Sequence, residues 1–239
     1  PFRTPHHTTS TPALVGGSTL IRPGEISLAH KGVLFLDELP EFRNEALQSL
    51  REPLEEKRIT IARARGAITY PADFQLIAAA NPCRCGNLFI EGGQCSCRKG
   101  TGLDQFAKLI GPFLDRIAIE LNLNELPSWP LNEAEYTTAR LQERIAARRS
   151  ESLARNKGVL NNSLEAAVLY RRLVHLNPQR LYERYAPQQR LSMRSWLNVL
   201  RVAQSIADFE DSDVTELNVH EALSYRVIQR KLATLRRAA

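Results

Sequence analysis

Two adjacent acids, Asp37 and Glu38, follow the apolar run from Gly32 to Leu36. A short apolar run of this kind favours a strand that is buried on both faces. At the carboxyl end of such a strand, the first carboxylate is suited to hold a Mg²⁺ that bridges nucleotide phosphates, and the second to orient and deprotonate a water. A buried strand that ends in an exposed acidic turn gives the same pattern, and this alternative stays open here.

A second strand-like run, Phe74 to Ala80, ends in Asn81 and Pro82. A carboxamide at a strand end beside an acid pair can hydrogen-bond both an attacking water and a terminal phosphate oxygen. An Asn-Pro pair alone is only a turn signal. The order of acid pair, helix, hairpin, strand and asparagine is much less expected by chance, and it favours a nucleotide site.

All four cysteines lie in one window, as the pairs Cys83-x-Cys85 and Cys95-x-Cys97. Two thiolate pairs joined by a short loop can surround one tetrahedral Zn²⁺, which would be structural because no ligand position is left for water. Reduced thiols and a disulfide are the alternatives, and a cytosolic setting disfavours the disulfide.

The elements that must position these groups change in kind along the chain. The first 125 residues predict α/β structure, and helices follow from Pro127 onward, so we expect an α/β core at 1–126 and a helical domain at 127–239. In the first part we predict strands at 33–36 and 74–79, a helix at 43–57, and a hairpin of 58–62 with 67–70 whose basic tip holds Arg63 and Arg65. In the second we predict helices at 132–157, from Ser163, from Ser192 to Asp208, and from Asn218.

Several longer motifs are similar to those of a known family. They are Pro-His-His-Thr at 5–8, Pro-Gly-Glu-Ile-Ser-Leu-Ala-His at 23–30, Gly-Val-Leu-Phe-Leu-Asp-Glu-Leu-Pro-Glu-Phe at 32–42, Ala-Asn-Pro-Cys at 80–83 and Gly-Pro-Phe-Leu-Asp-Arg-Ile at 111–117. In this order they resemble the ComM/YifB family, in the magnesium-chelatase-like branch of AAA+ proteins, over essentially the whole chain. The resemblance implies a partial AAA+ P-loop core, with a parallel sheet, helices and a β-hairpin insert, followed by an all-α lid domain.

The same resemblance implies ATP and Mg²⁺ as ligands and a role for each matching residue. It assigns the Walker B acids to Asp37 and Glu38, sensor 1 to Asn81, the arginine finger to Arg116 and sensor 2 to Arg194. An arginine suits the last two roles because its planar fork stays charged and grips phosphate oxygens. From the residues alone, Arg116 could equally pair with Asp115 or Glu120, and Arg194 could be an ordinary surface charge.

The chain departs from the family pattern at three points. It holds no Gly-x-x-x-x-Gly-Lys-Ser/Thr phosphate loop, so we expect it to start after that loop and, alone, to bind ATP poorly and be inactive. Ala118 stands where members commonly carry an acid, and Ile110 where they commonly carry serine. Both changes bear on the geometry around Arg116.

For partners, the resemblance implies a homo-oligomeric ring, as a hexamer, that moves single-stranded or branched DNA in the manner of a branch-migration helicase. The segment up to about Ala29 would project toward the pore and, with the Arg63 and Arg65 hairpin, face the DNA backbone. A solvated turn is the alternative for these arginines. Residues 126–239 carry the whole net charge of +6, which suits nucleic acid but is common elsewhere.

Other readings stay open beside the DNA motor. One is an AAA+ protein remodeller or chelatase-like chaperone, and another is a zinc-stabilised, non-enzymatic interaction module. His6 and His7 are expected to be surface or packing residues rather than metal ligands. No apolar run reaches the roughly 18 residues that a membrane span needs, so we expect a cytoplasmic protein without a membrane partner.

Overall fold

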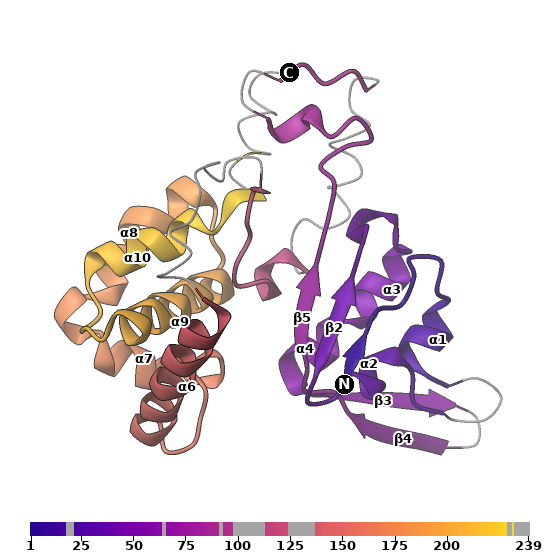
Figure 1. The fold of residues 1–239 in the computed structure, drawn as a ribbon, viewed down its shortest axis with the longest axis horizontal. Coiled ribbons are helices and arrows are strands. Elements are labelled where there is room, and N and C mark those ends of the chain that lie inside the picture. The colour runs from indigo at the N-terminus through magenta and orange to yellow at the C-terminus, as the bar shows by residue number, and fades with distance from the viewer. Residues whose placement is uncertain are drawn as a thin grey trace. The chain divides into compact units, whose positions relative to one another are not determined.

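The computed structural model describes residues 1–17, 22–63, 66–90, 93–97, 113–123, 137–228 and 231. The chain divides into two compact units, Pro1–Arg116 and Ile117–Ala239. Strands and short helices form the first unit, and the described elements of the second are helical (Figure 1). This confirms the predicted fold class, whereas the exact domain boundary at 126/127 stays a prediction.

A parallel sheet of three strands lies at the centre of the first unit. Its strands are β1 (Phe2–Arg3), β2 (Val33–Leu36) and β5 (Gln75–Ala78), in the order β1-β2-β5. The central strand pairs Val33 with Phe2 on one side and Leu36 with Ala78 on the other. Leu34 and Leu36 are fully buried, as expected for a central parallel strand covered on both faces. Both predicted strands are confirmed, and β1 is an addition.

The short helices of this unit are α1 (Thr11–Val15), α2 (Glu25–Leu28), α3 (Asn44–Ser49) and α4 (Arg51–Glu56). Its 3₁₀ turns are η1 (Leu39–Glu41), η2 (Asn87–Phe89) and η3 (Leu114–Arg116). The single helix predicted at 43–57 is wrong, because two helices meet at Leu50. Pro53 explains the break, since it has no amide to donate to the carbonyl of Ser49 and its ring would clash with it.

The predicted hairpin is confirmed. Strand β3 (Arg58–Arg63) pairs antiparallel with β4 (Gly66–Pro71), from Arg58 opposite Pro71 to Arg63 opposite Gly66. Ile59 and Ile61 alternate onto the buried face and are each 2% exposed. Arg65 at the tip lies outside the described residues, as does the side chain of Arg63.

Five helices are described in the second unit: α6 (Thr138–Arg155), α7 (Ala166–Arg172), α8 (Pro178–Gln189), α9 (Met193–Glu210) and α10 (Glu216–Ser224), with 3₁₀ turns η5 (Asn161–Ser163) and η6 (Val174–Leu176). Helix α9 supplies the centre of the core through Trp196, Val199, Leu200 and Ala203, which are fully buried. None of the described helices is long and apolar enough to cross a membrane.

The helix starts test the capping predictions one by one. Ser192 caps α9 as predicted, because its side chain accepts from the amide of Ser195 at 3.2 Å. Ser163 does not open α7, which starts at Ala166. Asn218 is not a cap but the third residue of α10, where it completes a capping box with Thr215. The predicted start of the first helix, near 132, lies outside the described residues.

A buried ion pair fastens the start of the second unit to its end. Arg226 Nη1 lies 3.3 Å from Glu120 Oε1, and both side chains are at most 2% exposed. Arg226 also donates to the carbonyl of Ile117, and Glu120 accepts from the amide of Ile228 at 2.7 Å. The residues directly after Arg116 are therefore held by the helical unit.

Candidate active site

The parallel register brings the acid pair and the asparagine to the same edge of the sheet. The amide of Ala79 donates to the carbonyl of Leu36, and the amide of Leu39 donates to the carbonyl of Ala79, both at 2.9 Å. The backbone after β2 therefore stays bonded to the backbone after β5 (Figure 1). Asp37, Glu38 and Asn81 follow these strand ends, and all three are exposed.

Glu38 has an unusual backbone conformation. Its φ of 50° and ψ of 45° lie in the left-handed region, which costs a residue with a Cβ about 1–2 kcal/mol. The Asp37 carboxylate offsets part of this cost, because its Oδ1 accepts from the amide of Glu38 at 2.8 Å. Six other non-glycine residues of the described chain, Lys31 and Lys57 among them, also have a positive φ, so this conformation alone does not mark a functional site.

His7 contacts the second acid. Its Nδ1 lies 2.8 Å from Glu38 Oε2, and its ring packs against that of His6 with centroids 4.1 Å apart. Thr8 holds the His6 ring in turn, with Oγ1 2.9 Å from Nδ1. No local pattern in the sequence predicts this contact, because it depends on β1 pairing parallel with β2.

Arg116 is held inside the first unit by a glutamate from α4. Its Nη2 lies 2.5 Å from Glu55 Oε1, and its side chain is only 7% exposed, while that of Glu55 is 35% exposed. The ion-pair partner is thus Glu55, which sequence analysis did not name. A pairing between η3 and α4 cannot be read from local spacing, since Glu55 and Arg116 are far apart in the chain.

Arg194 occupies the first turn of α9 and is exposed. The positive end of the helix dipole lies there, so a cation is disfavoured by about 0.3–1 kcal/mol. The helix dipole therefore does not favour an arginine at this position.

The four cysteines converge after β5. All four Sγ atoms lie within 4.8 Å of one another. Cys83 Sγ is 3.4 Å from Cys85 Sγ and 3.8 Å from Cys95 Sγ, and Cys85 and Cys95 are 3.5 Å apart. The backbone amide of Asn87, followed by the Cys83 side chain, lowers the pKa of Cys85 to about 5.

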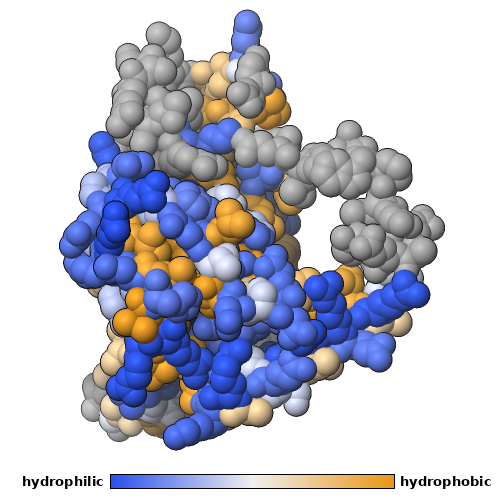
Figure 2. Space-filling view, turned by 90° about the vertical axis from the view of Figure 1, so that its left-hand side faces the viewer, coloured by the Kyte–Doolittle hydropathy of each residue, from blue (hydrophilic) through white to orange (hydrophobic). Residues whose placement is uncertain are grey.

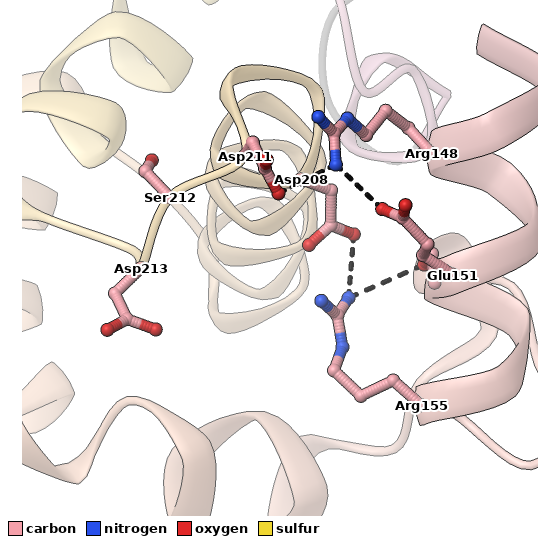
Figure 3. Close-up of a pocket in the computed structure, with 8 residues that line it drawn as sticks. Arg148, Glu151, Arg155, Asp208, Asp211, Ser212 and Asp213 are labelled. Carbon is pink, nitrogen blue, oxygen red and sulfur yellow. Dashed lines mark hydrogen bonds and ion pairs between the residues drawn. The ribbon is translucent and has the colours of Figure 1, made fainter. Parts of the chain in front are cut away.

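A charged pocket in the second unit contains none of the predicted site residues (Figure 3). Arg148 pairs with Glu151 and Asp211 at 2.8 and 2.6 Å, and Arg155 pairs with Asp208 at 2.7 Å. These ion pairs join α6 to the end of α9, so the pocket is lined by a structural network, in which four acids outnumber two arginines. Figure 2 shows a mostly hydrophilic face with scattered apolar patches.

A parallel sheet with an acid pair at a strand end, followed by a helical unit, defines a partial AAA+ core with a helical domain. The chain belongs to the magnesium chelatase ChlI family: the family model "Magnesium chelatase, subunit ChlI" matches residues 1–130, and the model of the ChlI C-terminal part matches residues 135–226. This family is AAA+ ATPase-like.

Individual relatives support this placement. The chain is 41% identical to YifB of Salmonella typhimurium over 242 residues, covering 99% of the chain and 47% of YifB. It is 38% identical to the competence protein ComM of Haemophilus influenzae over 241 residues, covering 98% and 47%. A shorter match of 69 residues, 41% identical, links 26% of the chain to 10% of an archaeal Lon protease of Thermoplasma volcanium. The chain thus spans about half the length of YifB and ComM.

Proposed function

We propose that this chain supplies the hydrolytic part of the ATPase site of an AAA+ motor that acts on DNA. The observation that carries the proposal is the register of β2 and β5, which sets Asp37, Glu38 and Asn81 along a single sheet edge. Ligands of open α/β sheets bind at the carboxyl ends of the strands, and this is that edge.

Each residue has a distinct role in this proposal. Asp37 would hold Mg²⁺, a role that fits its carboxylate oxygens and its exposed position. A bound Mg²⁺ would neutralise charge on the phosphate oxygens. Glu38 orients the attacking water and takes its proton, and the Asn81 carboxamide donates to a terminal phosphate oxygen. His7 keeps the Glu38 carboxylate in one place through its 2.8 Å contact. Arg194 grips phosphate from the helical unit.

Assembly completes the proposed site. AAA+ proteins often form oligomers, and we place Arg116 at the nucleotide of a neighbouring subunit in a hexameric ring. Within one chain Arg116 is committed to Glu55, so this role requires the guanidinium to exchange a carboxylate for a phosphate. Both partners offer the bidentate geometry that arginine favours.

DNA is the proposed substrate of the motor, single-stranded or branched. The name of the relative ComM ties that protein to competence. In this chain Arg63 ends β3, Arg65 falls between β3 and β4 in the sequence, and residues 126–239 hold an excess of basic side chains. Such charges bind a phosphate backbone without reading its sequence.

The decisive test substitutes Glu38→Gln in a protein of the relatives' full length that contains this chain. Loss of a general base lowers turnover by about 10²–10⁴-fold, so ATP hydrolysis should fall by that factor. Glu45→Gln, which changes an exposed acid of α3, is the matched control and should leave the rate unchanged. An unchanged rate in Glu38→Gln would remove the proposed role.

A protein remodeller of the same superfamily is the second candidate, favoured by the matches to magnesium chelatase and Lon protease. The two differ in their response to DNA. We expect DNA to raise ATP turnover, and Arg63→Ala with Arg65→Ala to lower the ratio of the rates with and without DNA. A ratio of one in the unmutated protein would favour the remodeller.

A further inference from the structure

The cysteine cluster has the dimensions of a single-ion site. Zinc binds thiolate sulfur at about 2.3 Å, so four sulfurs at the corners of a tetrahedron lie about 3.8 Å from one another. The three separations among Cys83, Cys85 and Cys95 are 3.4, 3.8 and 3.5 Å, and the Sγ of Cys97 is within 4.8 Å of all of them. These three separations are at or slightly below the tetrahedral value, so only small shifts of the sulfurs around one ion are needed.

The alternatives fit these separations less well. A disulfide joins two sulfurs at about 2.05 Å and would divide the cluster into pairs, whereas three of its edges are nearly equal. A cluster of several irons uses one thiolate or more at each of several metal ions and spreads the sulfurs further apart. Four thiolates at single-ion spacing match a closed structural zinc site.

The fold of this segment also calls for a cross-link. Among the described residues between 79 and 97, only Cys83 and Phe89 are buried, at 2% and 8% exposure, and the only regular structure is the turn η2. Its remaining ties include Gly86 N to Cys83 O at 3.0 Å and Asn87 Nδ2 to Gln94 O at 3.3 Å. With so little apolar burial, the folded conformation of this loop depends on a cross-link such as a bound metal.

We propose that Cys83, Cys85, Cys95 and Cys97 bind one structural Zn²⁺ as thiolates. The ion closes the segment after β5 into a compact loop. Cys83 lies two residues after Asn81, so the metal also limits where the Asn81 carboxamide can go. This last consequence rests on the proposed ATPase function, whereas the metal site itself does not.

Elemental analysis of the purified 239-residue chain tests the site directly. We expect one zinc per chain, four thiols protected from a thiol reagent, and release of the zinc in step with mercurial modification of those thiols. A chain without metal that also fails to take up Zn²⁺ under reducing conditions would overturn the proposal. Iron in place of zinc would overturn the identity of the ion.

Variants separate ligation from folding. Cys97→Ser should weaken Zn²⁺ affinity at least about tenfold in competition with a chromophoric chelator. Ser96→Ala, an exposed neighbour between two ligands, should keep the affinity of the unmutated chain. Amide exchange in β3–β4 reports whether the first unit of each variant is folded. If Cys97→Ser does not fold, the measurements on the unmutated chain still test the proposal.

Activity distinguishes this inference from the proposed function. In the protein of full family length, removing zinc should speed amide exchange at residues 79–90 and lower ATP turnover. Zinc binding without any ATPase activity would overturn the proposed function and leave the metal site standing. Full ATPase activity after complete zinc removal would overturn the link to Asn81.

Discussion

The ion pair between Glu55 and Arg116 allows a controlled test, because the neighbouring residue Glu56 makes a second arginine pair from the same helix. Glu55 binds an arginine that is 7% exposed, whereas Glu56 binds Arg58, and there the two side chains are 52% and 61% exposed. The shortest contacts are 2.5 and 2.7 Å, and Arg58 also donates to Glu56 Oε2 from its Nε at 3.1 Å, so the weaker expectation for Glu56 comes from its exposure and not from a poorer contact. Comparing the stability of the variants Glu55→Gln and Glu56→Gln therefore tests how much the burial of an ion pair matters.

The expected magnitudes follow from that difference. Removing one partner of a fully buried pair costs about 3–5 kcal/mol, and an exposed pair is worth about 0–1 kcal/mol. Because the Glu55 side chain keeps 35% of its exposure, we expect about 2 kcal/mol for Glu55→Gln, and below about 0.5 kcal/mol for Glu56→Gln. At 1.4 kcal/mol for each factor of ten, the first value raises the open fraction of the surrounding structure about 30-fold and the second about twofold.

Hydrogen exchange measured by mass spectrometry is the suitable assay, since it resolves α4 and η3 from the rest of the chain. Faster exchange in peptides that cover 51–56 and 113–116 should appear in Glu55→Gln and be nearly absent in Glu56→Gln. Equal acceleration in both variants would show that burial of Arg116 contributes nothing, and would refute the reasoning. A larger effect of Glu56→Gln would do the same.

Three further outcomes are expected. Asp208 accepts hydrogen bonds from Arg155 and Asn161 at 2.7 Å each, so Asp208→Asn should lower the unfolding free energy of the helical unit by about 1.5–3 kcal/mol. Urea titration followed by Trp196 fluorescence measures this change. The Asp211 side chain is 70% exposed, so Asp211→Asn should lower the unfolding free energy by less than about 1 kcal/mol. Burial raises the pKa of the Asp208 carboxyl, but hydrogen bonds from Arg155, Asn161 and Gln204 outweigh this effect and hold the pKa below 3.8. The stability that the Asp208 carboxylate contributes is therefore fully present above about pH 3.8 and is lost as the pH falls through the lower pKa of the folded state. Arg194→Gln should lower ATP turnover in the protein of full family length under conditions where urea titration shows the variant to be folded. Unchanged turnover together with a lower urea midpoint would assign Arg194 to the fold instead. His7→Ala should lower the turnover rate more than it changes the KM for ATP, and a change in KM alone would contradict a role in holding Glu38.

Local patterns in the sequence predicted much of the first unit. The apolar run before Asp37 and the alternating residues of the hairpin each carry a period that only one kind of element shows, and both elements formed as predicted. The two-residue strand β1 has no period to detect, and its place in the sheet is decided by pairing with β2. The contact of His7 with Glu38 was hidden for the same reason.

Proline had two opposite effects on what sequence could reveal. Pro53 ended a helix that the leucine spacing alone predicted as continuous. Helix α8, in contrast, was missed although Pro178 stands at its first position, where a missing amide costs nothing, and Pro187 is tolerated near its end. Leu181 and Tyr185 are buried in the core, and this tertiary packing outweighs the unfavourable local residues.

Burial of Arg116 sets a condition on the proposed assembly. A guanidinium that leaves Glu55 gives up about 2 kcal/mol, so a neighbouring subunit must offer more than this before the arginine moves. A neutral or hydrated surface does not offer Arg116 this much interaction free energy. The oxygens of a triphosphate do, because charge-assisted bidentate bonds are about twice as strong as neutral ones. The exchange therefore favours subunit contact only where nucleotide is bound. On the proposed function, Glu55 competes with the nucleotide for Arg116, so ring closure depends on ATP. Glu55→Gln should therefore let subunits associate at a lower nucleotide concentration while lowering the stability of each subunit. Loss of stability alone does not produce this combination.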